Sequence, residues 1–132
     1  MVRIEATYDG DLRCTATHGP SGKTLVTDAP VDNNGKGESF SPTDLLATSM
    51  LTCVMTIVAI RADSKGIDVS GMNGSIEKSM AANPRRIAKL EVTVNLPSDI
   101  SMDDRAWLIT EGCNCPVCVS VSESMEVDVT FL

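Results

Sequence analysis

The chain has 132 residues, which is enough for one domain with a hydrophobic core. Apolar residues make up 42% and charged residues 22%, a composition typical of a soluble globular protein. The net charge of −7 argues against nucleic acid and anionic membranes as partners, because phosphate groups are bound by clustered Lys and Arg.

Three short strands with alternating side chains are predicted at the start of the chain. Residues 2–8 and 12–18 flank an Asp-Gly turn, which favours a β-hairpin, and residues 23–28 add a third strand after a Gly-Pro turn. Residues 29–41 are rich in Pro, Gly, Asn and Ser and are expected to form a loop. The first part of the chain is therefore predicted to be an antiparallel meander.

Residues 42–64 form the clearest predicted element, a long helix. Ser41 is placed as its N-cap, Pro42 at its first position and Asp44 as the partner in an S-x-x-D capping box, while Gly66 fits the C-terminal stop. Apolar residues fall on nearly every face, which is typical of a buried central helix. Because one sheet in so small a domain cannot cover every side, a second subunit is expected to cover the rest.

The remainder of the chain predicts two strands, two helices and a last strand. Their ranges are 67–81, 85–96, 101–113, 116–124 and 125–132. Ser101 and Asp104 form a second capping box, and Pro116 opens the short helix. The order βββ-α-ββ-α-α-β, with antiparallel strands, predicts an α+β fold and a single domain over residues 1–132.

The location of the protein is inferred from two segments. The first ten residues, MVRIEATYDG, contain no apolar core of the kind found in signal peptides. Residues 45–60, the longest apolar stretch, are interrupted by Ser and Thr and are judged too short and too polar to span a bilayer. Both observations favour the cytoplasm, where thiols stay reduced unless they take part in redox or metal chemistry.

The segment EGCNCPVCVSV places Cys113, Cys115 and Cys118 within six residues. A structural zinc site usually needs four ligands, supplied by two Cys pairs or by Cys with His. The distant residues that could supply a fourth ligand are Cys14, Cys53 and His18. None of them belongs to a second closely spaced pair of metal-binding residues, so no metal site is predicted.

Two redox interpretations of the cysteines remain. The sequence CPVC has the spacing of a thioredoxin-like pair, Cys115 with Cys118, but it follows a predicted helix rather than a strand. Alternatively, Cys115 works with the distant Cys53. Cys115 precedes Pro116 at a helix N-terminus, where the dipole favours a thiolate. Cys53 lies inside the long helix, and its simpler interpretation is a small core residue without a chemical role. A reactive Cys53 would need a nearby positive charge or hydrogen-bond donor.

The segment SPTDLLATSMLTC resembles the central-helix signature of the OsmC/Ohr family, osmotically inducible protein C and organic hydroperoxide resistance protein. That signature is a Pro, a following acidic residue, a Leu pair, small residues and a Cys eleven positions after the Pro. Pro42 and Cys53 have this spacing. CPV at 115–117 is similar to the second cysteine motif of the family, the predicted order of elements matches, and the resemblance covers nearly the whole chain.

The resemblance implies a thiol peroxidase. Cys53 would attack the O–O bond of an organic hydroperoxide and become a sulfenic acid, and Cys115 would condense with it to a disulfide. An external dithiol, lipoyl-linked in the best-known members, would reduce that disulfide in the course of oxidative stress defence. The resemblance implies no metal and no bound cofactor. It also implies an intertwined homodimer, with the long helices buried between two sheets and each active site built from both chains.

The activating residues depart from the family pattern. Peroxidase members carry a Glu directly after the motif Pro, paired with an Arg from the N-terminal region. Thr43 stands at that position here, and Asp44 is either a shorter substitute or simply a helix cap. Arg13 and His18 are the candidates for the positive partner. Their simpler interpretations are a surface strand charge and an exposed turn residue.

The other thiols, Cys14, Cys113 and Cys118, are interpreted as small packing residues. For Cys118 a functional hypothesis stands beside this one, in which it exchanges with Cys115 and passes oxidation toward the surface. Two alternatives to peroxidase activity also remain open. One is a generic dithiol–disulfide redox protein, and the other is a protein that binds a small apolar ligand in the dimer cavity without turnover. That cavity would be lined by Met50, Leu51 and Met55.

Overall fold

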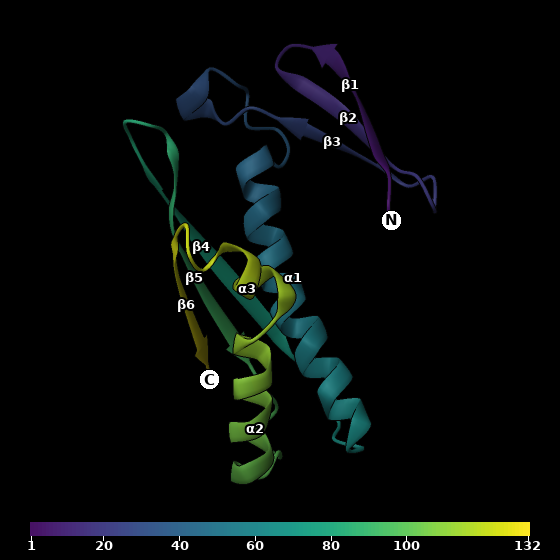
Figure 1. Ribbon diagram of the computed structural model, residues 1–132, viewed down its shortest axis with the longest axis vertical. Helices are drawn as coiled ribbons and strands as arrows, with labels where there is room; N and C mark the ends of the chain where they lie inside the picture. The colour runs from purple at the N-terminus through teal and green to yellow at the C-terminus, as the bar shows by residue number, and fades with distance from the viewer. The chain divides into compact units, whose positions relative to one another are not determined.

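The computed structural model describes all residues from 1 to 132, and they form two compact units, residues 1–46 and 47–132 (Figure 1). The elements are β1 (Ile4–Gly10), β2 (Arg13–His18), β3 (Thr24–Asp28), η1 (Val31–Asn33), α1 (Pro42–Ser64), β4 (Asn73–Ala81), β5 (Arg86–Asn95), α2 (Met102–Cys113), α3 (Pro116–Val121) and β6 (Glu126–Phe131). The predicted order and the α+β class are confirmed, and the short 3-10 helix η1 is an addition inside the predicted loop. The single domain over 1–132 stays a prediction.

The first unit is the predicted meander. β2 pairs antiparallel with both β1 and β3. The segment after β3 then folds back along this strand, since the Asp28 amide donates to the Phe40 carbonyl at 3.1 Å. Gly35 makes the return turn, where a Cβ atom would lie 1.7 Å from the Ala29 carbonyl oxygen. Only glycine fits there, because any other side chain would overlap the backbone.

The N-terminus of α1 is built as the sequence predicts. The Asp44 amide donates to Ser41 Oγ at 3.1 Å, and the Ser41 amide donates to Asp44 Oδ2 at 2.9 Å. These two reciprocal bonds satisfy amides that the first helical turn leaves without partners. The predicted capping box is therefore confirmed, with Asp44 as one of its two members.

The burial of α1 differs from the prediction of a helix covered on every side. One stripe is buried, consisting of Ala47, Met50, Val54, Val58 and Ala62. The opposite side carries Thr52, Thr56 and Ile60, and these three are exposed. A single chain therefore covers one face of the helix, and cover by a second subunit stays a prediction.

By length and composition alone α1 could cross a membrane, so the expectation that this stretch is too short and too polar is wrong. The core helix of a globular protein meets the same criterion. Val54 and Val58 of α1 are completely buried and would contact a Cβ atom placed on Gly112 of α2. This packing against a second helix is that of a core helix.

The sheet of the second unit is mixed, which corrects the prediction of antiparallel strands throughout. β4 pairs antiparallel with β5, but β6 pairs parallel with β5. Parallel neighbours need a long crossover connection, and α2 and α3 supply it between β5 and β6. The strand predicted at 67–81 also begins later, at Asn73, because turns follow α1.

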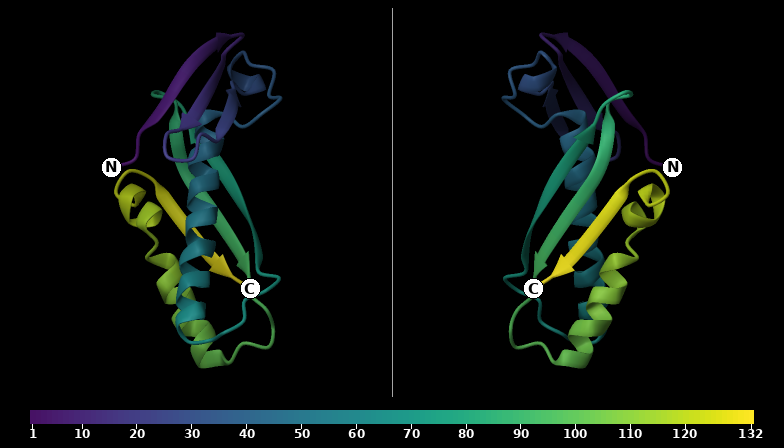
Figure 2. Two further views of the ribbon diagram at one scale, coloured as in Figure 1. Left: turned by 90° about the vertical axis from the view of Figure 1, so that its right-hand side faces the viewer. Right: turned by 90° about the vertical axis from the view of Figure 1, so that its left-hand side faces the viewer.

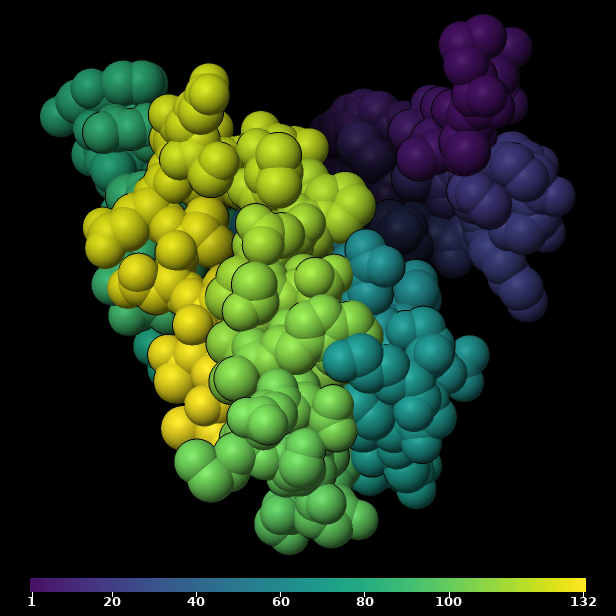
Figure 3. Space-filling model, turned by 60° about the horizontal axis from the view of Figure 1, so that its bottom comes forward, coloured from purple at the N-terminus to yellow at the C-terminus, as the bar shows by residue number.

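One face of this sheet is apolar except for Lys78, and it faces the helices. Its cross-strand rows are Gly74–Val94–Phe131, Ile76–Val92–Val129 and Lys78–Leu90–Val127. α1 lies on this face (Figure 2), and a Cβ atom on Gly74 would lie 3.1 Å from Leu51 of α1. α2 fills the space between α1 and β6 (Figure 3), where a Cβ atom on Gly112 would lie 2.7 Å from the Phe131 ring. The core of this unit therefore lies between the sheet and the two longer helices.

Candidate functional site

Three cysteines of the second unit gather where the first turn of α3 meets the middle of α1. Cys115 is the N-cap of α3, Pro116 occupies its first position, and the Cys115 thiol accepts a hydrogen bond from the Cys118 amide at 3.2 Å. Proline fits this position because its missing N–H would have had no partner in the helix. The predicted helix start at Pro116 is confirmed, and it sets Cys115 and Cys118 on one side of a single turn.

Cys53 completes this group from α1. Its thiol lies close enough to the Cys115 thiol and to the backbone N–H of Val117 for both to shift its pKa. It is half-buried, while Cys115 is fully buried. The structure thus brings together the two cysteines that the sequence analysis pairs, although 62 residues separate them in the chain.

Cys118 belongs to the same group. Its Sγ lies 2.8 Å from Cys115 Sγ and 3.1 Å from Met50 Sδ. The packing interpretation of Cys118 is correct as far as burial goes, since the residue is 5% exposed, but its neighbours are sulfur atoms. The sequence analysis named Met50 as lining a ligand cavity and did not place it beside the cysteines. The signal was available, because Met50 precedes Cys53 by three positions and so lies on the same side of α1.

The pKa values of the three thiols are set mainly by burial. Burial raises the pKa of Cys53, the Val117 N–H opposes this, and the contact with Cys115 adds to the rise. Burial also raises the pKa of Cys115 and that of Cys118. No Lys or Arg of residues 47–132 is among the groups that shift the pKa of Cys53. Within this unit the neutral thiols are therefore favoured at neutral pH.

The remaining cysteines lie elsewhere. Cys113, at the C-terminal end of α2, is exposed, so its interpretation as a packing residue is wrong. Cys14 lies on β2 in the first unit and is half-buried. Neither has a sulfur contact like the 2.8 Å contact between Cys115 and Cys118. We therefore define the thiol cluster as Cys53, Cys115 and Cys118, with the Met50 thioether beside it.

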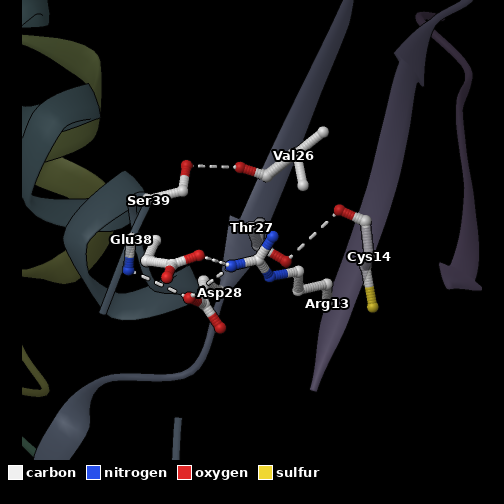
Figure 4. Close-up of polar contacts among 7 residues, drawn as sticks. All are labelled: Arg13, Cys14, Val26, Thr27, Asp28, Glu38 and Ser39. Carbon is white, nitrogen blue, oxygen red and sulfur yellow. Dashed lines mark hydrogen bonds and ion pairs between the residues drawn. The ribbon is translucent and has the colours of Figure 1, made fainter. Parts of the chain in front are cut away.

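The candidate activating residues all lie in the first unit. Arg13 donates through Nη2 to Asp28 Oδ2 at 3.4 Å and to Glu38 Oε2 (Figure 4). Arg13 is about one-third exposed, but Asp28 is completely buried, so Arg13 is more than a surface strand charge. His18 is exposed, with Nδ1 at 2.7 Å from Ser21 Oγ, which fits its simpler interpretation.

The pairing of Arg13 with two carboxylates shifts the pKa values of this group. The hydrogen bond to Glu38 and the charges of Asp28 and Glu38 raise the pKa of Arg13, against the opposing effect of burial. The pKa of Asp28 is lowered chiefly by the Glu38 amide, which donates to Oδ2 at 3.0 Å, and further by Arg13. Sequence reasoning missed Asp28, because nothing in the local pattern TLVTD distinguishes a buried carboxylate at a strand end from an exposed one.

Comparison with known proteins identifies the family. The OsmC-like protein family matches residues 35–130 of this chain. The chain belongs to the OsmC family. The OsmC fold thus accounts for the order of elements described above, and the resemblance drawn from the two cysteine motifs is confirmed. Among curated protein sequences, none matches this chain.

Several solved structures share this OsmC-like fold. A proposed osmotic stress induced and detoxification response protein from Psychrobacter arcticus is 39% identical over 100% of this chain and 96% of its own, with a TM-score of 0.93. Organic hydroperoxide resistance proteins from Legionella pneumophila and Elizabethkingia anophelis are 14% and 15% identical, each with a TM-score of 0.80. They cover 99% of this chain, and 96% and 94% of their own lengths. These neighbours share the fold of this chain over nearly its whole length.

Proposed function

We propose that this OsmC-like protein is a thiol-dependent peroxidase that reduces organic hydroperoxides in oxidative stress defence in the cytoplasm. The observation that carries the proposal is the proximity of the Cys53 and Cys115 thiols, each of which shifts the pKa of the other. A sulfenic acid formed on either sulfur would meet a second thiol at once, which is the reversible branch of cysteine oxidation. Membership of the OsmC family supports the same chemistry.

Cys53 is the proposed nucleophile. Its thiolate attacks the terminal oxygen of the hydroperoxide, the O–O bond breaks, and the alkoxide leaves as an alcohol after taking up a proton. Cys53 is then a sulfenic acid. The Cys115 thiol attacks the Cys53 sulfur, water leaves, and a Cys53–Cys115 disulfide forms. An external dithiol reduces this disulfide by two exchange steps and is itself oxidised to a disulfide. No metal and no bound cofactor take part in this proposal.

Cys53 rather than Cys115 is assigned the first step because of its surroundings. Cys53 is half-buried, while Cys115 is 0% exposed, so a hydroperoxide reaches Cys53 more readily. The Val117 N–H also donates toward Cys53 and stabilises a negative charge on its sulfur. Because burial dominates this effect, a cation is needed for fast turnover at neutral pH. Arg13 is the proposed source of that positive charge, and His18 is the other candidate. The bonds of Asp44 with Ser41 give this residue the role of a helix cap.

A homodimer with shared active sites completes the proposal. The exposed side of α1 carries Thr52, Thr56 and Ile60, and a second copy of this helix would cover it. Ile60 is 57% exposed, and a second copy of the helix would remove this apolar side chain from water. Sedimentation equilibrium tests this assembly, with Ile60→Arg expected to shift the protein toward the monomer and the exposed Arg61→Ala as the control.

The decisive experiment measures peroxide consumption. Reduced protein is mixed with cumene hydroperoxide in the presence of dithiothreitol or dihydrolipoamide, and loss of peroxide is followed. Wild type is expected to turn over and Cys53→Ser to lose activity completely. Cys115→Ser is expected to turn over more slowly, because its Cys53 sulfenic acid can condense only with the external dithiol. Cys14→Ser, a cysteine of the other unit, is the matched control and keeps full activity. If wild type shows no turnover, the peroxidase proposal is wrong, and if Cys53→Ser retains turnover, the nucleophile is misassigned.

A further inference from the structure

Cys115 has two thiol neighbours, and the proposed function uses only one of them. On one side Cys53 of α1 lies near enough to shift the pKa of Cys115. On the other side its Sγ lies 2.8 Å from that of Cys118, one turn further along α3. A disulfide has a bond length of about 2.05 Å and forms without backbone movement only when the two Cβ atoms are already close. Cys115 and Cys118 therefore need a small adjustment of side chains to become a bonded pair.

The first turn of α3 also favours reaction at these two sulfurs. The Cys118 amide donates to Cys115 Sγ at 3.2 Å, so a charge arising on Cys115 is held by a fixed donor. Burial raises the pKa of the Cys118 thiol, and the hydrogen bond from Cys115 opposes that rise. Cys115 thus stands between two potential partners, with Cys53 and Cys118 competing for a bond to the same sulfur.

We propose that Cys118 is a second resolving thiol that moves the oxidised bond from Cys53–Cys115 to Cys115–Cys118, an inference that rests on the proposed peroxidase function. The Cys118 sulfur attacks Cys115 Sγ in the Cys53–Cys115 disulfide. The Cys53–Cys115 bond breaks, Cys53 leaves as a thiolate and takes up the proton that Cys118 has lost. The product is a Cys115–Cys118 disulfide and a free Cys53 thiol. No oxidant or reductant is consumed, because the step is an internal exchange.

The exchange would carry the oxidised bond to the side of the cluster that borders a surface depression. Cys118 lines a surface depression of about 300 Å³, together with Cys113, Asn114, Val119 and Val127. Cys53 and Cys115 are not among its lining residues. A dithiol reductant bound in this depression would lie beside Cys118, while Cys53 is already free for the next hydroperoxide. The relay would therefore separate the site of peroxide attack from the site of reduction.

Peptide mapping of the full-length protein tests the relay directly. Trypsin releases Cys53 in the peptide 37–61, whereas Cys113, Cys115 and Cys118 stay in the peptide 106–132, because no Lys or Arg follows Arg105. A Cys53–Cys115 bond is therefore a cross-link between two peptides, and a Cys115–Cys118 bond is internal to one. Reduced protein is given one equivalent of cumene hydroperoxide, quenched in acid at increasing times, alkylated and digested.

In wild type we expect the cross-link to appear first and to be replaced by the internal bond, with Cys53 again alkylated. Cys118→Ser and Cys118→Ala should both trap the cross-link and lose the internal bond completely, and Cys14→Ser should behave as wild type. Two substitutions at Cys118, with unfolding midpoints measured for each, separate loss of the thiol from loss of packing. If the cross-link persists in wild type while Cys118 is alkylated, the relay is wrong although the peroxidase proposal stands.

A separate arm removes peroxide from the test. Cys53→Ser is equilibrated with oxidised dithiothreitol, which supplies the oxidising equivalents by thiol–disulfide exchange. The Cys115–Cys118 bond is expected to form, and its absence would overturn the relay. If wild type forms this bond under the same conditions but never consumes hydroperoxide, the proposed function fails together with the relay that depends on it. The two failures are thus distinguishable.

Discussion

The Cys118 thiol of α3 lies 3.1 Å from the thioether sulfur of Met50 on α1, in a region where both side chains are buried. Met50 lies almost one turn before Cys53 on the same helix. The contact therefore fixes the first turn of α3 on the part of α1 that carries Cys53. A short helix of six residues gains its place from this packing rather than from its own stability.

Met50 should contribute to stability through its volume. Met50 is 0% exposed, so Met50→Ala is expected to lower the free energy of unfolding by about 2–5 kcal/mol through a cavity. Met50→Leu, which nearly conserves volume, should cost less than about 1.5 kcal/mol. Urea denaturation of both variants measures this difference. Equal losses would show that the sulfur contact with Cys118, and not the volume, is what Met50 supplies.

The reactivity of Cys53 should rise steadily with pH. Because burial raises its pKa and only the thiolate reacts, alkylation by iodoacetamide is expected to keep accelerating above about pH 8.5, the ordinary thiol value. The rate is measured from the alkylated 37–61 peptide, with the chain unfolded in urea as the reference. A plateau below about pH 7 would contradict this expectation and would require a cation close to the sulfur.

The close packing of α2 against α1 and β6 predicts the effect of a single methyl group. In Gly112→Ala the new Cβ atom would lie 2.7 Å from the Phe131 ring and 2.9 Å from Val58. Overpacking of this kind costs about 1–3 kcal/mol, which outweighs the gain in helix propensity of about 1 kcal/mol. Thermal or urea unfolding is the measurement, and the exposed Ala106→Gly gives the propensity effect alone in the same helix. A stabilised Gly112→Ala variant would show that this interface is open.

Asp28 should make stability depend on acid pH. Its folded pKa lies below the ordinary value, so its ionised form contributes stability above the unfolded pKa, and this contribution is lost as pH falls through the folded pKa. Asp28→Asn is therefore expected to be less stable than wild type at about pH 7, with the gap narrowing from about pH 5 downward. Urea midpoints at several pH values measure the gap, and the exposed Asp63→Asn controls for the loss of one negative charge. A gap that is constant with pH would contradict the ionised pairing of Asp28 with Arg13.

The order and approximate ranges of the helices and strands could largely be predicted from local sequence signals. Turns at Gly and Asp, the capping box at Ser41, the N-cap at Ser101 and Pro116 each act within a few residues. The elements that they bound therefore fell close to the predicted ranges. The parallel pairing of β6 with β5 could not be predicted from the sequence, because the partner of a strand depends on contacts between segments that are distant in the chain. The same reason explains Asp28, whose burial depends on a loop that returns beside β3.

The amino-acid sequence by itself determined the order of elements, the helix that carries Cys53 and the turn that carries Cys115, since these depend on propensity, capping and spacing. The family resemblance added the pairing of these two cysteines. Only the tertiary structure decided that Cys118 and Met50 join them, and that Cys113 stays exposed. Three thiols within six residues look equivalent in a sequence. They become different when packing against α1 buries two of them and leaves the third in solvent.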